Sequence, residues 1–179
     1  GPNEDLEKYP RPFKKDINIC KSEGVDVIFA PMLKEMYPEN YLTYIIIGKL
    51  SDIMCGKFRP EHFRGVATIV AKLFNIVQPD RAYFGLKDYQ QSVIIKKMVT
   101  DLNFPVQIID CPIVREKDGL ALSSRNVYLS YEERKKALSL SRSLQTVKNL
   151  IKYKNIKSAE KIISEMRKII SPNVDKIDY

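Results

Sequence analysis

Apolar residues recur three and four positions apart along the stretch that follows Pro60. The residues of this stripe are Val66, Ile69, Val70, Leu73, Phe74 and Val77. The spacing predicts an α-helix with one buried face, because positions three and four apart lie on the same side of a helix. Pro60 is a favourable first helical residue and Pro79 ends the pattern, so these two prolines bound the predicted helix.

Four short apolar runs predict buried strands. Their sequences are VDVIFAP at 25–31, YIIIG at 44–48, RAYFG at 81–85 and VQIIDC at 106–111. Helices are predicted between them: one contains residues 17–22 and ends near Gly24, and another covers residues 88–102. Strands that alternate with helices indicate an α/β domain, with a mainly parallel sheet flanked by helices.

The pattern becomes helical near Ser130. This serine and Glu133 have the spacing of a capping box, and a long helix is predicted to follow. Its apolar stripe is Leu140, Leu144, Val147 and Ile151, and a second helix carries Ile162, Ile163, Met166, Ile169 and Ile170. Residues 174–179 resemble the start of a strand. We therefore predict one domain in residues 1–113 and a partial, α+β domain in residues 114–179.

The composition, 44% hydrophobic and 29% charged, is typical of a globular protein. No apolar run approaches the roughly 20 residues of a membrane-spanning helix, and no signal-peptide pattern is present at the start. We therefore expect a cytoplasmic protein without membrane partners. Cys20, Cys55 and Cys111 form no CxxC pair, which argues against a disulfide framework or a zinc site and favours buried free thiols.

The net charge of +8 raises the question of nucleic-acid binding. From Tyr131 onward there are twelve Lys and Arg against six Asp and Glu, whereas residues 1–130 hold eighteen against sixteen. Most of the excess therefore lies on the predicted C-terminal helices, interleaved with Ile and Leu. This distribution favours the solvated face of amphipathic helices over a nucleic-acid surface.

The segment YFGLKDYQQ, residues 83–91, places charged residues where a strand gives way to a helix. Asp88 and Gln91 have the spacing of a helix cap and its partner. Lys87 would then lie beside free amides at the positive end of a helix dipole, which suits a phosphate. The alternative is an ordinary cap beside a solvated lysine, and the motif alone leaves both open.

The segment RPEHFRGV, residues 59–66, places Arg59, His62 and Arg64 at the start of the predicted helix. Cations at a helix N-terminus oppose its dipole, so a bound anion would relieve the conflict. The alternative for His62 is a half-buried imidazole satisfied by neighbouring groups. Both interpretations stand at this point.

The segment DGLALSSRN, residues 118–126, combines two hydroxyls with a guanidinium. Ser123, Ser124 and Arg125 could clamp a phosphate, but these nine residues alone favour a polar turn. Known nucleotide-binding and hydrolytic motifs give no further guidance, because the dinucleotide fingerprint, the P-loop, GxSxG and HExxH are all absent. A nucleotide would have to be held by side chains and helix ends.

Four long segments, in order, resemble the pantothenate synthetase family, the pantoate–β-alanine ligases. They are GPNEDLEKYPR, RPEHFRGVATIVAKLFNIVQPD, YFGLKDYQQ and PIVREKDGLALSSRNVYLS, and the resemblance covers essentially the whole chain. It implies a Rossmann-like homodimer related to class I aminoacyl-tRNA synthetases. It also implies an ATP-dependent ligase that uses Mg²⁺: pantoate attacks ATP to give pantoyl adenylate and pyrophosphate, and β-alanine displaces AMP to give pantothenate.

The resemblance assigns roles to residues of the three candidate motifs. Contacts to ATP would come from Gly85, Leu86, Lys87, Asp88, the backbone of Val114, Leu122, Ser123, Ser124 and Arg125. Gln91 would hold pantoate, and the same cleft would be lined by Arg59 and His62. The catalytic groups around the pyrophosphate would be Lys87, Ser123, Ser124 and Arg125, with Mg²⁺ completing the cage. No protein metal ligand is assigned. Residues 123–125 would correspond to the mobile KMSKS loop of the synthetases.

The chain departs from the family pattern in two residues and in one segment. Leu86 replaces the glutamate of GEKD, and Glu61 replaces the glycine of RPGHF. The family's HxGH segment, which would precede GPNEDL, is not in the sequence. We therefore expect the 179-residue chain alone to be poorly soluble and to make no pantothenate. The competing interpretation is a non-catalytic remnant of the fold that acts only in dimerisation.

Overall fold

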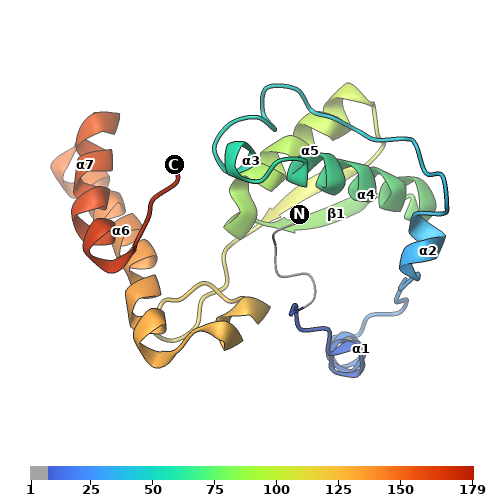
Figure 1. Ribbon diagram of the computed structural model, residues 1–179, viewed down its shortest axis with the longest axis horizontal. Helices are drawn as coiled ribbons and strands as arrows, with labels where there is room; N and C mark the ends of the chain where they lie inside the picture. Colours follow the sequence, from blue (N-terminus) through green and yellow to red (C-terminus); the bar gives the residue numbers. More distant parts are fainter. Residues whose placement is uncertain (1–7) are drawn as a thin grey trace. The chain divides into compact units, whose positions relative to one another are not determined.

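Strands β1 (Arg81–Gly85) and β2 (Gln107–Cys111) form the sheet of a computed structural model that describes residues 8–179. They are parallel, with Arg81 opposite Gln107 and Gly85 opposite Cys111. Helix α5 (Tyr89–Asp101) connects them, as Figure 1 shows. These three elements confirm the α/β prediction for 81–85, 88–102 and 106–111 to within one residue at each end.

Helix α4 (His62–Val77) packs against α5 through small side chains. The core cluster of buried residues consists of Ala67, Ala71, Phe74, Ile95 and Met98. Ala67 and Ala71 of α4 are in this cluster, and the partly buried Val66 and Val70 pack against it. The predicted buried face is confirmed in part, since Phe74 lies in the cluster, and Val66 and Val70 pack against it. It is wrong at Val77, which is 54% exposed, and it omitted the buried Phe63 and Thr68.

Two of the four predicted strands do not form. Residues 25–31 and 44–48 are irregular, and in residues 8–179 the only sheet is the pair β1–β2. Val27 is 78% exposed, and the amide of Ile45 donates to the Thr68 side-chain oxygen at 3.0 Å. An apolar run becomes a strand only beside another strand, and neither run has one here.

The remaining helices before the sheet are short. They are α1 (Phe13–Ser22), α2 (Leu33–Met36) and α3 (Cys55–Phe58). The prediction of a helix ending near Gly24 is confirmed, because α1 ends at Ser22 and Gly24 has the positive φ of 74° expected after a helix. Residues 1–7, which begin the first family-like segment, lie outside the described residues.

The chain divides after Cys111 into two compact units, unit 1 (Gly1–Cys111) and unit 2 (Pro112–Tyr179). Unit 2 contains two 3-10 helices, η2 (Ser124–Tyr128) and η3 (Ser171–Asn173), and two long helices, α6 (Tyr131–Lys154) and α7 (Ala159–Ile170). No strand follows η3 in the described residues, so the prediction for 174–179 is wrong. The functional assignment of 1–113 and 114–179 remains a prediction.

The capping box at the start of α6 is confirmed. The Ser130 amide donates to Glu133 Oε2 at 2.8 Å, and the Glu133 amide donates to Ser130 Oγ at 3.3 Å. The predicted apolar stripe of α6 is wrong, because Leu140 is 55% exposed while Leu138, Ser139 and Ser143 are buried. Helix α6 packs against α7 in unit 2, and such tertiary contacts decide which of its faces is covered.

Candidate functional site

A strand, a single 3-10 turn and a helix follow one another at the first candidate motif. Strand β1 ends at Gly85, η1 (Leu86–Asp88) turns the chain, and α5 begins at Tyr89. Asp88 occupies the predicted N-cap position of α5, but its side chain makes no capping hydrogen bond, so the prediction is confirmed in position only. The amides in the first turn of α5 are not used by that carboxylate, and Lys87 is exposed beside them.

Gln90, in the first turn of α5, forms hydrogen bonds with the loop at residues 50–55. Its Oε1 accepts from the Cys55 amide at 3.1 Å, and its Nε2 donates to the carbonyls of Leu50 and Ile53, both at 2.9 Å. The sequence analysis missed this residue, since a glutamine beside Gln91 gives no local signal of a partner 35 positions away. Its neighbour Gln91 is half-buried in the same helical turn.

Arg59 and His62 bind each other. Nη1 of Arg59 lies 3.0 Å from Nε2 of His62 and 3.9 Å from Sγ of Cys55. A guanidinium can only donate, so in this contact Nε2 of His62 is the acceptor. This geometry matches the alternative interpretation of His62, a half-buried imidazole satisfied by a neighbouring group. Through Cys55 and Gln90, the pair is connected to the start of α5.

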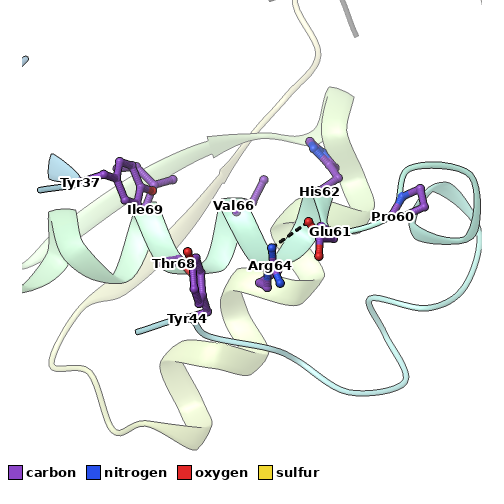
Figure 2. Close-up of a pocket in the computed structure, with 10 residues that line it drawn as sticks. Tyr37, Tyr44, Pro60, Glu61, His62, Arg64, Val66, Thr68 and Ile69 are labelled. Carbon is purple, nitrogen blue, oxygen red and sulfur yellow. Dashed lines mark ion pairs between the residues drawn. The ribbon is translucent and has the colours of Figure 1, made fainter. Parts of the chain in front are cut away.

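A cavity of about 490 Å³ opens beside the N-terminal half of α4. Its lining includes Tyr37, Tyr44, Glu61, His62, Arg64 and Thr68. Figure 2 shows the Arg64 guanidinium directed at Glu61, and the ion-pair distance is 2.8 Å. Arg64 also lies over the Tyr44 ring, 4.7 Å from its centroid. The expected conflict of cations at this helix end is therefore eased by a carboxylate of the chain itself.

The SSR turn, residues Ser123–Arg125, begins η2. Ser123 Oγ accepts from the Arg125 amide at 3.2 Å, while the Leu122 amide donates to the Val114 carbonyl at 2.9 Å. The side chains of Ser124 and Arg125 are exposed. The polar turn that the nine residues favoured is confirmed as local structure. The phosphate clamp remains a prediction.

An ion-pair network lies beside the SSR turn. Arg134 contacts Glu116 Oε2 at 2.7 Å and Asp118 Oδ2 at 2.6 Å. The Arg134 hydrogen bond, and then that of Asn126, lowers the pKa of Glu116. For Asp118 the pKa is lowered first by the Leu120 amide and then by Arg134. The two carboxylates raise the pKa of Arg134, so all three groups stay charged at neutral pH.

The predicted site residues fall in both units. Unit 1 contains Arg59, His62, Gly85, Leu86, Lys87, Asp88 and Gln91, and unit 2 contains Val114, Leu122, Ser123, Ser124 and Arg125. Within residues 8–179, no three His, Cys, Asp or Glu side chains gather where they could hold a metal ion. The three cysteines are free, as predicted, but partly exposed rather than buried. None of the described helices combines the length and apolar character needed to cross a membrane.

Known proteins resemble the chain in both sequence and structure. The family model of pantoate-beta-alanine ligase matches residues 1–179. The pantothenate synthetase of Caldicellulosiruptor bescii is 56% identical over 181 residues, which cover 100% of this chain and 64% of that protein. The crystal structure of pantothenate synthetase from Thermus thermophilus has a TM-score of 0.91 at 47% identity, covering 96% of this chain and 62% of that one.

A third relative was solved with bound ligands. The pantoate-beta-alanine ligase of Francisella tularensis, complexed with beta-gamma ATP and beta-alanine, has a TM-score of 0.74 at 35% identity, covering 94% of this chain and 62% of that one. The chain spans about 64% of the length of its C. bescii relative. The superpositions confirm the predicted α/β fold class. Because the family model covers residues 1–179 and the sequence identity extends over the same length, the chain belongs to the pantoate-beta-alanine ligase family.

Proposed function

We propose that this chain forms the major part of an ATP-dependent ligase that condenses pantoate with β-alanine through a pantoyl adenylate. The observation that carries the proposal is the junction of β1, η1 and α5, where Lys87 is exposed beside helix amides that Asp88 does not cap. A helix N-terminus at the carboxyl end of a parallel strand is a favourable place for a phosphate. The F. tularensis relative, solved with beta-gamma ATP and beta-alanine, supports the choice of nucleotide.

Unit 1 would bind the triphosphate and pantoate. In this proposal Lys87 neutralises phosphate charge, and the chain at Gly85, Leu86 and Asp88 contacts the nucleotide. Gln91 holds pantoate, while Arg59 and His62 line the same cleft. The hydrogen bond from Arg59 Nη1 to His62 Nε2 would hold the two side chains together at the cleft.

Unit 2 would supply the clamp on the leaving group. Arg125 provides a permanent charge, Ser123 and Ser124 provide hydroxyl donors, and the chain at Val114 and Leu122 contacts the nucleotide. The exposure of Ser124 and Arg125 leaves their side chains accessible to a ligand. Mg²⁺ would enter with ATP, because this ion is usually bound through substrate phosphates and water.

The chemistry proceeds in two balanced steps. A carboxylate oxygen of pantoate attacks the α-phosphorus of ATP, and the bond to the β-phosphate oxygen breaks to release pyrophosphate. The β-alanine amine then attacks the acyl carbon, loses a proton and expels AMP. Neither step needs a nucleophile from the protein, so positioning and charge neutralisation carry the acceleration.

We further propose that the protein acts as a cytoplasmic homodimer; no observation favours the alternative of a remnant that only dimerises.

Isotope exchange between pyrophosphate and ATP tests the adenylate mechanism in the protein expressed from its complete gene. Exchange should require pantoate and proceed without β-alanine. Lys87→Met should reduce the exchange rate, while Lys97→Met serves as the matched control, since Lys97 is an exposed lysine that pairs with Asp101 at the other end of α5. Exchange that depends on β-alanine, or formation of ADP, would contradict the proposal.

A further inference from the structure

Arg134, in the first turn of α6, bridges two carboxylates from the loop before the SSR turn. Nη2 donates to Glu116 Oε2 at 2.7 Å and to Asp118 Oδ2 at 2.6 Å, and Nε donates to Asp118 Oδ2 at 2.8 Å. Asp118 uses its other oxygen to accept from the Leu120 amide at 3.1 Å. The forked guanidinium therefore fixes two points of this loop relative to the helix.

The same network reaches the SSR turn through Asn126. Its Nδ2 donates to Glu116 Oε1 at 2.7 Å and to the Ala121 carbonyl at 3.1 Å. Asn126 directly follows Arg125, and its amide donates to the Ser123 carbonyl at 3.1 Å. Glu116 thus accepts from α6 on one oxygen and from the end of the turn on the other. Through Asn126 and Glu116, the Ser123 carbonyl at the start of the SSR turn is connected to Arg134 of α6 by consecutive hydrogen bonds.

We propose that Arg134 and Asn126, acting through Glu116, are positioning residues that hold the SSR turn in the conformation that binds the leaving pyrophosphate. The identity of the ligand, pyrophosphate, rests on the proposed function. The coupling between α6 and the SSR turn does not. Neither residue needs to touch ATP. A clamp displaced by about 1 Å loses on the order of a hundredfold in rate, so residues behind the clamp can control it.

The alternative is that the network only stabilises unit 2. The side chains of Arg134, Glu116 and Asp118 are 30%, 31% and 35% exposed, so solvent screens their attraction. Ion pairs of this exposure contribute little to the free energy of folding. A stabilising role alone therefore predicts small effects on both stability and turnover, whereas positioning predicts a large effect on turnover.

The test compares Arg134→Gln with Lys135→Gln in the protein expressed from its complete gene. Lys135 is the matched control, because it is the next residue of α6 and its contacts are with other residues of the same helix: it pairs with Glu132 at 3.0 Å and lies over the Tyr131 ring, 4.0 Å from its centroid. Arg134→Gln should lower kcat for pyrophosphate exchange by about 10- to 100-fold and leave the KM for pantoate unchanged. Arg134→Lys should be intermediate, since one ammonium cannot reproduce the fork. Lys135→Gln should match the wild type.

Hydrogen exchange of the amides of residues 121–126 gives a readout that is independent of ligase activity. Arg134→Gln and Asn126→Ala should both speed this exchange, and Asn126→Ala leaves the pairs of Arg134 intact if the first variant fails to fold. If hydrogen exchange becomes faster in these variants but the wild-type protein never makes an adenylate, the proposed function is refuted, while the coupling between α6 and the SSR turn is retained. An unchanged kcat in Arg134→Gln, or an equal loss in Lys135→Gln, would overturn the positioning role.

Discussion

The carboxylate of Glu61 lies 2.8 Å from the Arg64 guanidinium, while the Glu61 backbone has a left-handed φ of 65°. The ion pair is favourable, whereas the left-handed backbone conformation is not. A non-glycine residue in this region costs roughly 1–2 kcal/mol, whereas an exposed ion pair contributes about 0.5 kcal/mol. The strain is therefore the larger effect. The glycine of the family pattern RPGHF would avoid it.

Replacing Glu61 should separate these two effects. Glu61→Gln removes the charge and keeps the strain, so the free energy of unfolding should fall by about 0.5 kcal/mol or less. Glu61→Gly removes both, and should be more stable than Glu61→Gln by about 1 kcal/mol. Urea unfolding of the three proteins measures the differences. If Glu61→Gly is the least stable, the positive φ is not a source of strain.

Removing the Gln90 side chain should loosen the loop at residues 50–55. Gln90→Leu removes the partner of the Cys55 amide and of the Leu50 carbonyl, which should cost about 1–3 kcal/mol. The Ile53 carbonyl loses one donor but keeps the Gly56 amide at 3.0 Å. Gln90→Glu keeps an acceptor for Cys55 but loses both donors, so its loss should be of similar size. Hydrogen exchange at the Cys55 amide checks the loop directly: it should accelerate in Gln90→Leu and remain slow in Gln90→Glu.

Acid should weaken the network around Arg134. The pKa values of Glu116 and Asp118 are lowered in the folded protein, so the folded state binds fewer protons than the unfolded state. Their stabilisation is present above the ordinary carboxyl pKa of about 4 and disappears as the pH falls through the lowered values. Urea midpoints measured from neutral pH to below about pH 4 should fall more steeply in the wild type than in Arg134→Gln.

The pH effect in Arg134→Gln should be reduced but not abolished. The Leu120 amide, which the substitution leaves in place, is the larger cause of the lowered pKa of Asp118. Lys135→Gln should retain the wild-type slope. Parallel pH profiles for wild type and Arg134→Gln would show that the ion pairs do not contribute to folding stability.

Arg125→Ala should chiefly slow adenylate formation. Losing one charge-assisted contact to a leaving group should raise the barrier by about 2–4 kcal/mol. Ser123→Ala should cost less as a ligand contact, because a neutral hydroxyl is the weaker donor. It also removes the acceptor for the Arg125 amide, so it reports on the turn as well. Single-turnover measurements with ATP and pantoate compare the rate of adenylate formation in Arg125→Ala and Ser123→Ala. Near-normal turnover in Arg125→Ala would show that SSRN is only a polar turn.

Much of the candidate site could be located from sequence because its signals are local. The strand before Gly85, the helix after Asp88 and the capping box of Ser130 depend on residues within a few positions of one another. The four family-like segments indicated the family, and the family match confirms that recognition. The roles assigned to individual residues remain a prediction. Gln90 and Arg134 were missed, because their partners lie far away along the chain.

The sequence by itself determined helices α1, α4, α5, α6 and α7 and the turn at Ser123, since steric preference and local hydrogen bonding are decided within a few residues. Only the tertiary structure decided which apolar runs became strands. Residues 81–85 pair with residues 107–111, whereas residues 25–31 and 44–48 pair with no strand in the described part of the chain. It also decided that Ala67 and Ala71 are buried in the core cluster, while the larger Val66 and Val70 are only partly buried. The physical reason is that strand pairing and close helix packing depend on a second segment, whose position the local pattern does not contain.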